Sequence, residues 1–124
     1  MSKLVPLKTN YGTEVLVSAL KLSYISNILK IVKDIKCIDK VYIFGSSVRE
    51  DCQDASDVDI AVVGDFINKS DWLHSKDADV LYNSLLDFDD NQEYDIVYRY
   101  KEDKDDFYNM FEKGVLLYKR EESI

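Results

Sequence analysis

The sequence is poor in cysteine, proline and histidine, and each shortage narrows what the protein can do. Its 124 residues include two cysteines, one proline and one histidine. Cys37 and Cys52 form neither a disulfide framework nor a metal-ligand spacing, so we expect reduced thiols and a cytoplasmic location. The single histidine, His74, has no serine or cysteine partner at a recognisable spacing. We therefore do not expect a histidine-dependent nucleophile.

Basic residues and long apolar runs are also scarce. The chain has 16 Lys and Arg against 24 Asp and Glu, a net charge of −8. Because non-specific nucleic-acid binding depends on basic side chains that neutralise phosphates, this balance argues against it. It fits a small substrate that arrives with a metal ion, or a basic protein partner. No apolar run approaches the length of a membrane span, so we expect no membrane association.

An apolar content of 46% and an aromatic content of 12% predict one globular domain over residues 1–124. Residues 1–12 are interpreted as an extended N-terminal arm. The remaining elements are expected in the following order: a helix over about 14–36, a strand over 40–44, a short helix over 46–52, a polar loop over 53–56, a strand over 57–63, a helix over about 71–88 that possibly breaks, a strand over 93–100, a helix from about 105 to Gly114, and a strand over 115–118. This order predicts an α/β (α+β) fold, a small mixed sheet with helices mainly on one face.

The stretch from residue 41 to residue 63 is the most informative part of the chain. One apolar strand ends at Gly45 and Ser46, and the next begins at Asp57-Val58-Asp59. Strand residues two apart point to the same face, so Asp57 and Asp59 project together. Two carboxylates that close repel each other unless a cation lies between them, and Mg²⁺ prefers oxygen ligands. A lone D-x-D is usually a solvated turn, but this context favours a metal site.

The Gly45-Ser46 turn is a candidate phosphate site. If Ser46 begins a helix, free backbone N–H groups and the helix dipole face an anion. Ser46 and Ser47 also offer hydroxyl groups, although helix capping is the alternative for each. Arg49 either contacts a phosphate or pairs with a neighbouring acid. Ser56 either supports the carboxylates or simply forms a turn.

Asp95 is the candidate third carboxylate. It lies inside the predicted third strand, where an unpaired Asp is unfavourable unless a metal is near. The alternative is a strand-end Asp that faces water or pairs with Arg99. We favour the catalytic interpretation, because two-metal chemistry needs ligands from both flanks and a group that accepts a proton. Carboxylates beside a phosphate-binding turn are typical of phosphoryl or nucleotidyl transfer.

These residues resemble a known family. Gly45-Ser46, Arg49 and Ser56-Asp57-Val58-Asp59 are similar to the G-S…S-D-x-D signature of the DNA polymerase beta-like nucleotidyltransferase superfamily. The short chain, and its ending over residues 112–118, most resemble the minimal nucleotidyltransferases, or MNT proteins. The resemblance covers about residues 14–118. The sequence differs from the family pattern at Glu50, where many members have Gly. A negative charge at this position weakens triphosphate binding unless the side chain points away from the nucleotide.

The resemblance implies a polymerase beta-like nucleotidyltransferase fold and a transfer of AMP from ATP to an acceptor hydroxyl, with a pair of Mg²⁺ ions. By the same resemblance, Asp57, Asp59 and Asp95 hold the metal, and Asp95 helps to deprotonate the acceptor. Gly45 and Ser46 bind the β- and γ-phosphates, and pyrophosphate leaves.

The resemblance also implies a partner. Minimal members are often encoded beside a HEPN protein, a helical RNase toxin, and act as its antitoxin by adenylylating a toxin tyrosine. Two alternatives stay open. One is the catalytic subunit of a two-component antibiotic nucleotidyltransferase, and the other is a non-catalytic subunit that neutralises a partner by contact alone.

Overall fold

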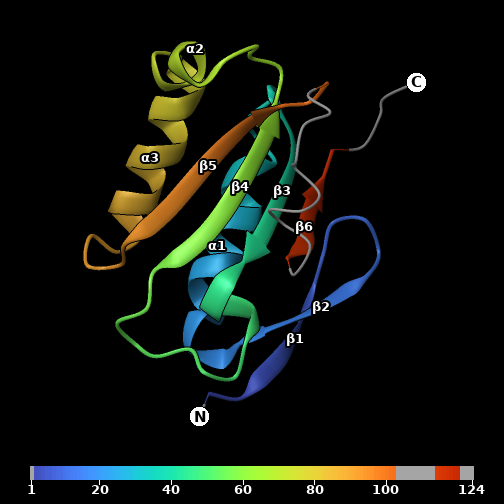
Figure 1. Ribbon diagram of the computed structural model, residues 1–124, viewed down its shortest axis with the longest axis vertical. Helices are drawn as coiled ribbons and strands as arrows, with labels where there is room; N and C mark the ends of the chain where they lie inside the picture. The colour runs from blue at the N-terminus through green and yellow to red at the C-terminus, as the bar shows by residue number, and fades with distance from the viewer. Residues whose placement is uncertain (1, 103–113, 121–124) are drawn as a thin grey trace.

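A four-stranded mixed sheet is the centre of the computed structural model, which describes residues 2–102 and 114–120 (Figure 1). Its strands are β3 (Ile38–Phe44), β4 (Val58–Gly64), β5 (Tyr94–Tyr100) and β6 (Val115–Lys119), in the order β5-β4-β3-β6. Strand β3 is antiparallel to both β4 and β6, whereas β4 and β5 are parallel. The mixed sheet confirms the predicted fold class.

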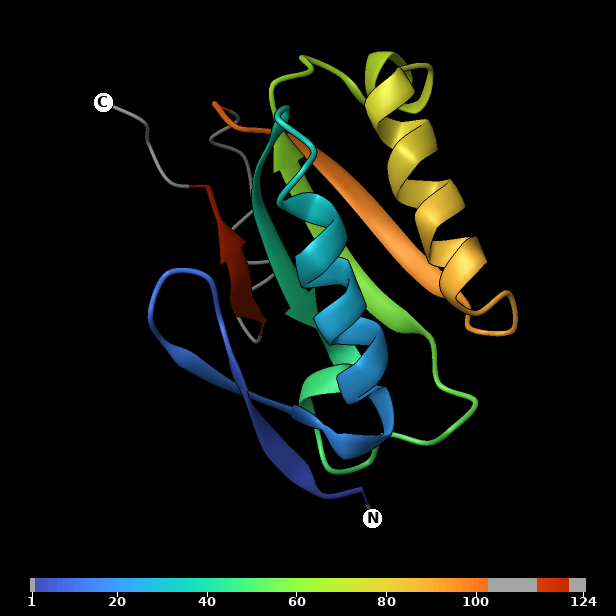
Figure 2. The same ribbon diagram turned by 180° about the vertical axis from the view of Figure 1, so that it is seen from behind.

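The helices α1 (Leu22–Val32) and α3 (Lys76–Phe88) cover one face of the sheet (Figure 2). Their apolar faces pack on β-branched strand residues, and the largest buried side chain, Trp72, stacks on Tyr98 with ring centroids 5.2 Å apart. The predicted break in the second long helix is confirmed, because α2 (Lys69–Leu73) ends before α3 begins. Asn68 caps α2 by accepting a hydrogen bond from the Asp71 N–H at 2.8 Å.

The N-terminal region differs from the prediction. Strands β1 (Leu4–Lys8) and β2 (Glu14–Ser18) form an antiparallel hairpin, so the predicted arm over 1–12 and the predicted helix start at 14 are wrong. Val17 is fully buried while its neighbour Leu16 is 55% exposed, an alternation that a half-buried strand produces. Gly12 supplies the turn with a φ of 90°. Helix α1 therefore begins only at Leu22, after a 3-10 turn over Ala19–Lys21, and ends at Val32.

Two further predictions concern the remaining segments. The predicted helix over 46–52 is only a 3-10 turn over Gly45–Val48. The predicted helix from 105 to Gly114 falls on 103–113, outside the described residues, whereas the predicted final strand is present as β6. No helix in the described part of the chain is both long enough and apolar enough to cross a membrane.

Candidate active site

Two of the predicted carboxylates lie side by side on parallel strands. Asp59 of β4 is in register with Asp95 of β5, and Asp59 also lies opposite Phe44, where β3 ends. Residues Val58, Ile60 and Val62 alternate with Asp59 along the strand and are fully buried beneath the helices. Because neighbours along a strand point to opposite faces, both acids project from the face that α1 and α3 do not cover.

The glycine of the predicted turn lies against one of these acids. Gly45 follows β3 and has a φ of +71°, in the left-handed region that side chains rarely adopt. A Cβ atom added at Gly45 would overlap the Asp59 carboxylate. The Gly45 backbone is therefore packed on Asp59, and the phosphate-binding turn predicted from the sequence adjoins the predicted carboxylate pair.

The charges in this region act on one another. Burial raises the pKa of Asp59 above its ordinary value, and the negative charges of Asp95 and Asp57 raise that pKa further. The positive charge of Arg49 lowers it. The three predicted carboxylates and Arg49 thus share one electrostatic environment, although Asp57, just before β4, is itself exposed to solvent.

The donor set fits a divalent cation in its chemistry. The negative charges of Asp57 and Asp95 oppose the ionised form of Asp59, and a divalent cation with oxygen ligands, such as Mg²⁺, would relieve this repulsion. Within residues 2–102 and 114–120, however, no three Asp, Glu, His or Cys side chains are already arranged as a metal centre. Asp57 and Asp95 are both exposed, so their side chains have room to turn towards a cation.

The two serines of the turn have different environments. Ser46 is half-buried, and its carbonyl accepts a hydrogen bond from the Arg49 N–H at 3.0 Å. Ser47 is fully buried, so this side chain faces the interior of the protein, and its hydroxyl has no hydrogen-bond partner in the part of the chain that the structure describes. Ser46 can therefore contact a nucleotide at the surface more readily than the buried Ser47 hydroxyl can.

The other candidate residues support the loop before β4. Arg49 forms an exposed ion pair with Asp51 at 3.0 Å, one of the two roles predicted for it, while its charge also acts on Asp59. The Ser56 hydroxyl accepts a hydrogen bond from the Gln53 N–H at 3.0 Å, as expected of a turn residue. Glu50 is exposed.

A pocket adjoins this end of the sheet. It has a volume of about 380 Å³, and Asp57 forms part of its wall. Leu85, Leu86 and Ile96 supply apolar surface, while Asp90 and Glu93 add negative charge. An apolar group that carries or adjoins a positive charge suits such a pocket better than an anion does.

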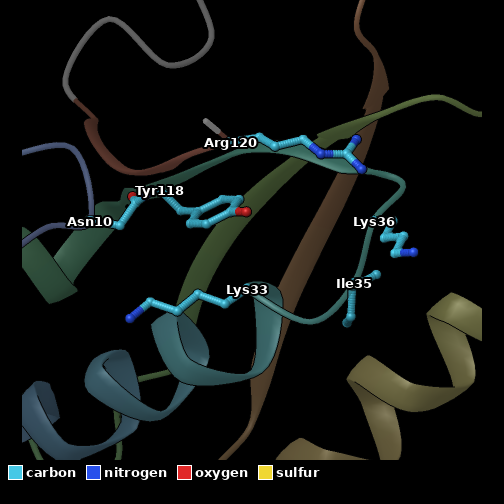
Figure 3. Close-up of a pocket in the computed structure, with 6 residues that line it drawn as sticks. All are labelled: Asn10, Lys33, Ile35, Lys36, Tyr118 and Arg120. Carbon is cyan, nitrogen blue, oxygen red and sulfur yellow. The ribbon is translucent and has the colours of Figure 1, made fainter. Parts of the chain in front are cut away.

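A second pocket, of about 470 Å³, lies at the opposite end, where β3 begins and β6 ends (Figure 3). Lys33 stands on one side of it, and Lys36 and Arg120 on the other. The charged ends of Lys33 and Lys36 point away from each other. The basic groups thus surround the pocket without converging on one point within it.

Comparison with known proteins identifies the family. Residues 26–123 match the family model described as Polymerase beta, Nucleotidyltransferase. The chain belongs to this nucleotidyltransferase family. The crystal structure of "a putative nucleotidyltransferase from Sulfolobus solfataricus" aligns with a TM-score of 0.46 and 24% identity, over 85% of this chain and 84% of that chain. No curated protein matches the sequence.

Family membership confirms the resemblance drawn from the G-S…S-D-x-D signature at the level of the nucleotidyltransferase family. Sequence reasoning missed two residues of this nucleotidyltransferase domain that contact the loops before β4 and β5. Lys21 is 1% exposed, and Gln92 hydrogen-bonds to both loops. Neither belongs to a motif, and the apolar spacing around Lys21 gives no sign that this lysine is buried.

We expect Gly45→Ala to destabilise the protein more than Gly12→Ala does. Both glycines have a positive φ, so both substitutions carry the backbone strain, about 1–2 kcal/mol. Only at Gly45 does the new methyl group meet a neighbour, Asp59, which adds about 1–3 kcal/mol of overpacking. Urea denaturation measures both losses. Equal losses would show that the turn does not pack on Asp59.

We expect Asp59→Asn to stabilise the metal-free protein at neutral pH. The raised pKa means that folded Asp59 holds its proton more tightly than the unfolded chain, whose pKa is near 3.8. Stability contributed by this group is therefore full below pH 3.8 and is lost as the pH rises through the folded pKa. The melting temperature of the variant should exceed that of the natural protein by an amount that grows as the pH rises from 3.8 to the folded pKa of Asp59, and that stays constant above it.

The control for this comparison is Asp34→Asn, at an exposed acid beyond α1. Because isolated surface charges contribute little, its melting temperature should follow that of the natural protein closely. A difference between Asp59→Asn and the natural protein that is the same at all pH values would contradict the assignment of a raised pKa.

Proposed function

We propose that this nucleotidyltransferase transfers AMP from ATP to a hydroxyl group of a partner protein in the cytoplasm, as the antitoxin of a helical HEPN-type toxin. The observation that carries the proposal is the register of Asp59 with Asp95, beside the Gly45 turn. It supports an arrangement in which the nucleotide phosphates and the attacking hydroxyl meet at one end of the sheet.

Each residue has a role in the proposed reaction. Asp57, Asp59 and Asp95 would hold Mg²⁺, which supplies charge neutralisation for the phosphates when bound. The Gly45-Ser46 turn would orient the β- and γ-phosphates through its backbone and the Ser46 hydroxyl. Asp95, exposed on the neighbouring strand, would accept the proton of the acceptor hydroxyl as its oxygen bonds to the α-phosphorus and pyrophosphate leaves.

The charge of the protein supports a protein acceptor. With a net charge of −8 and with Asp90 and Glu93 lining the pocket beside Asp57, the acceptor side repels anions. Its apolar wall, which includes Leu85 and Ile96, suits an aromatic residue such as the tyrosine of a basic partner. The charge of Arg49 acts on Asp59, which supports a phosphate-binding role for this side chain.

The same acidic pocket also favours a second candidate. Aminoglycosides are cationic, so a two-component antibiotic nucleotidyltransferase would use Asp57 and its acidic neighbours in a similar way. Incubation with aminoglycosides and lincosamides in the presence of radiolabelled ATP separates this candidate from a protein acceptor.

The test uses the purified protein, the product of its neighbouring gene, ATP and Mg²⁺. We expect the mass of the partner to rise by one AMP unit, and Asp57→Asn and Asp59→Asn to abolish the increase. Asp34→Asn should leave it unchanged, because Asp34 is exposed and lies at the other end of α1. If the two inactive variants neutralise the partner as well as the natural protein does, contact alone is the function.

A further inference from the structure

Lys21 is a buried lysine for which no ion pair is found in the described part of the chain. It lies just before α1 with 1% of its surface exposed. Its Nζ donates hydrogen bonds to the Asp54 carbonyl oxygen at 2.9 Å and to Gln92 Oε1 at 2.8 Å, and it lies 5.7 Å from the centre of the Tyr24 ring. Burying a charge without a carboxylate partner is unfavourable, so this arrangement needs an explanation beyond packing.

Gln92 extends the contact from Lys21 to both loops. Its Nε2 donates to the Ser56 carbonyl oxygen at 3.1 Å and to the Glu93 carbonyl oxygen at 2.8 Å. The Glu93 carbonyl also accepts a hydrogen bond from the Val58 N–H at 3.0 Å. One ammonium group and one amide group thus tie together the loop that ends at Ser56 and the segment that leads into β5.

These two segments carry the candidate metal ligands. Asp57 follows Ser56 directly, and Asp95 lies two residues after Glu93. Tyr24 adds a second tether from α1, since its hydroxyl donates to Asp89 Oδ2 at 2.7 Å in the turn before β5. The start of α1 therefore fixes the separation of the two backbone segments from which the acids project.

We propose that Lys21 and Gln92 are positioning residues that hold Asp57 and Asp95 at the separation needed to bind a divalent cation. This inference rests on the proposed function, because it takes the carboxylates to be metal ligands. Lys21 acts through the backbone in this scheme. Its charge is not among the causes that shift the pKa of Asp59, whereas that of Arg49 is.

The direction in which cation affinity changes distinguishes a positioning role from a purely electrostatic one. Lys21→Met and Gln92→Glu each make this end of the protein more negative by one charge. A field effect alone would therefore strengthen cation binding in both variants. Loss of positioning would weaken cation binding, because Lys21→Met removes the two hydrogen bonds that Nζ donates, and Gln92→Glu removes the two amide hydrogen bonds to Ser56 and Glu93.

The experiment titrates the purified full chain with Mn²⁺, without nucleotide, and measures free ion by electron paramagnetic resonance. We expect both variants to bind Mn²⁺ about tenfold more weakly than the natural protein, as is typical when the groups behind metal ligands are removed. Hydrogen exchange at the Val58 amide, measured without metal, should become faster in both variants. Gln92→Glu removes the hydrogen bond to its acceptor Glu93 directly, and Lys21→Met removes the hydrogen bond that holds Gln92.

The control is Val32→Ala. Val32 is fully buried in the last turn of α1, so this variant lowers the melting temperature without contacting either loop. Its Mn²⁺ affinity should equal that of the natural protein. An equal loss of affinity in Val32→Ala would mean that general destabilisation explains the result, and would overturn the proposal.

The remaining outcomes are also distinct. If the natural protein fails to bind Mn²⁺, the proposed function fails, and with it the positioning role. If the natural protein binds and both variants bind equally well or more tightly, the positioning role alone is overturned. Should Lys21→Met not fold, Gln92→Glu decides, because Gln92 is only half-buried.

Discussion

The parallel pairing of β4 and β5 brings Asp59 beside Asp95, and the rest of the site is arranged around that pair. Parallel strands need a crossover, which here contains α2 and α3 and returns over one face of the sheet. Since that face is filled by apolar side chains, the polar side chains of Asp59 and Asp95 lie on the opposite face. The chain topology therefore separates a packing face from a chemical face within two strands.

Unfavourable local features gather at this end of the sheet. Asp59 is partly buried with a raised pKa, Gly45 has a positive φ, the Ser47 hydroxyl has no partner among the described residues, and Lys21 is a buried cation. Gly45 adopts this φ without steric strain, but the three polar side chains each cost folding free energy. Such features persist where the surrounding structure enforces them, commonly at functional sites. At the other end of the sheet, Lys33, Lys36 and Arg120 lie around a pocket without converging on its interior.

Much of the sheet was predictable, because its strands are short apolar runs bounded by polar turns. The acids Asp57, Asp59 and Asp95 were recognisable because a carboxylate within such a run is rare. The start of α1 was not predictable from spacing, since Val15 fits a helical pattern with Ala19 and an alternating pattern with Val17, and only pairing with β1 decides between them. The burial of Lys21 was not predictable for a related reason. Its burial depends on three segments that are distant in the sequence and meet only in the fold.

The positions of Lys21 and Gln92 suggest how a site of mutually repelling ligands is kept compatible with folding. Carboxylates locked together without a cation would destabilise the native state, whereas carboxylates on mobile loops would bind a cation weakly. Among the described residues, the hydrogen bonds that Lys21 and Gln92 make to these two segments reach the carbonyl groups of Asp54, Ser56 and Glu93 and no carboxylate. This arrangement fixes the backbone while leaving the exposed side chains of Asp57 and Asp95 able to turn. It also accounts for acids that share one electrostatic environment without already forming a metal centre among the described residues.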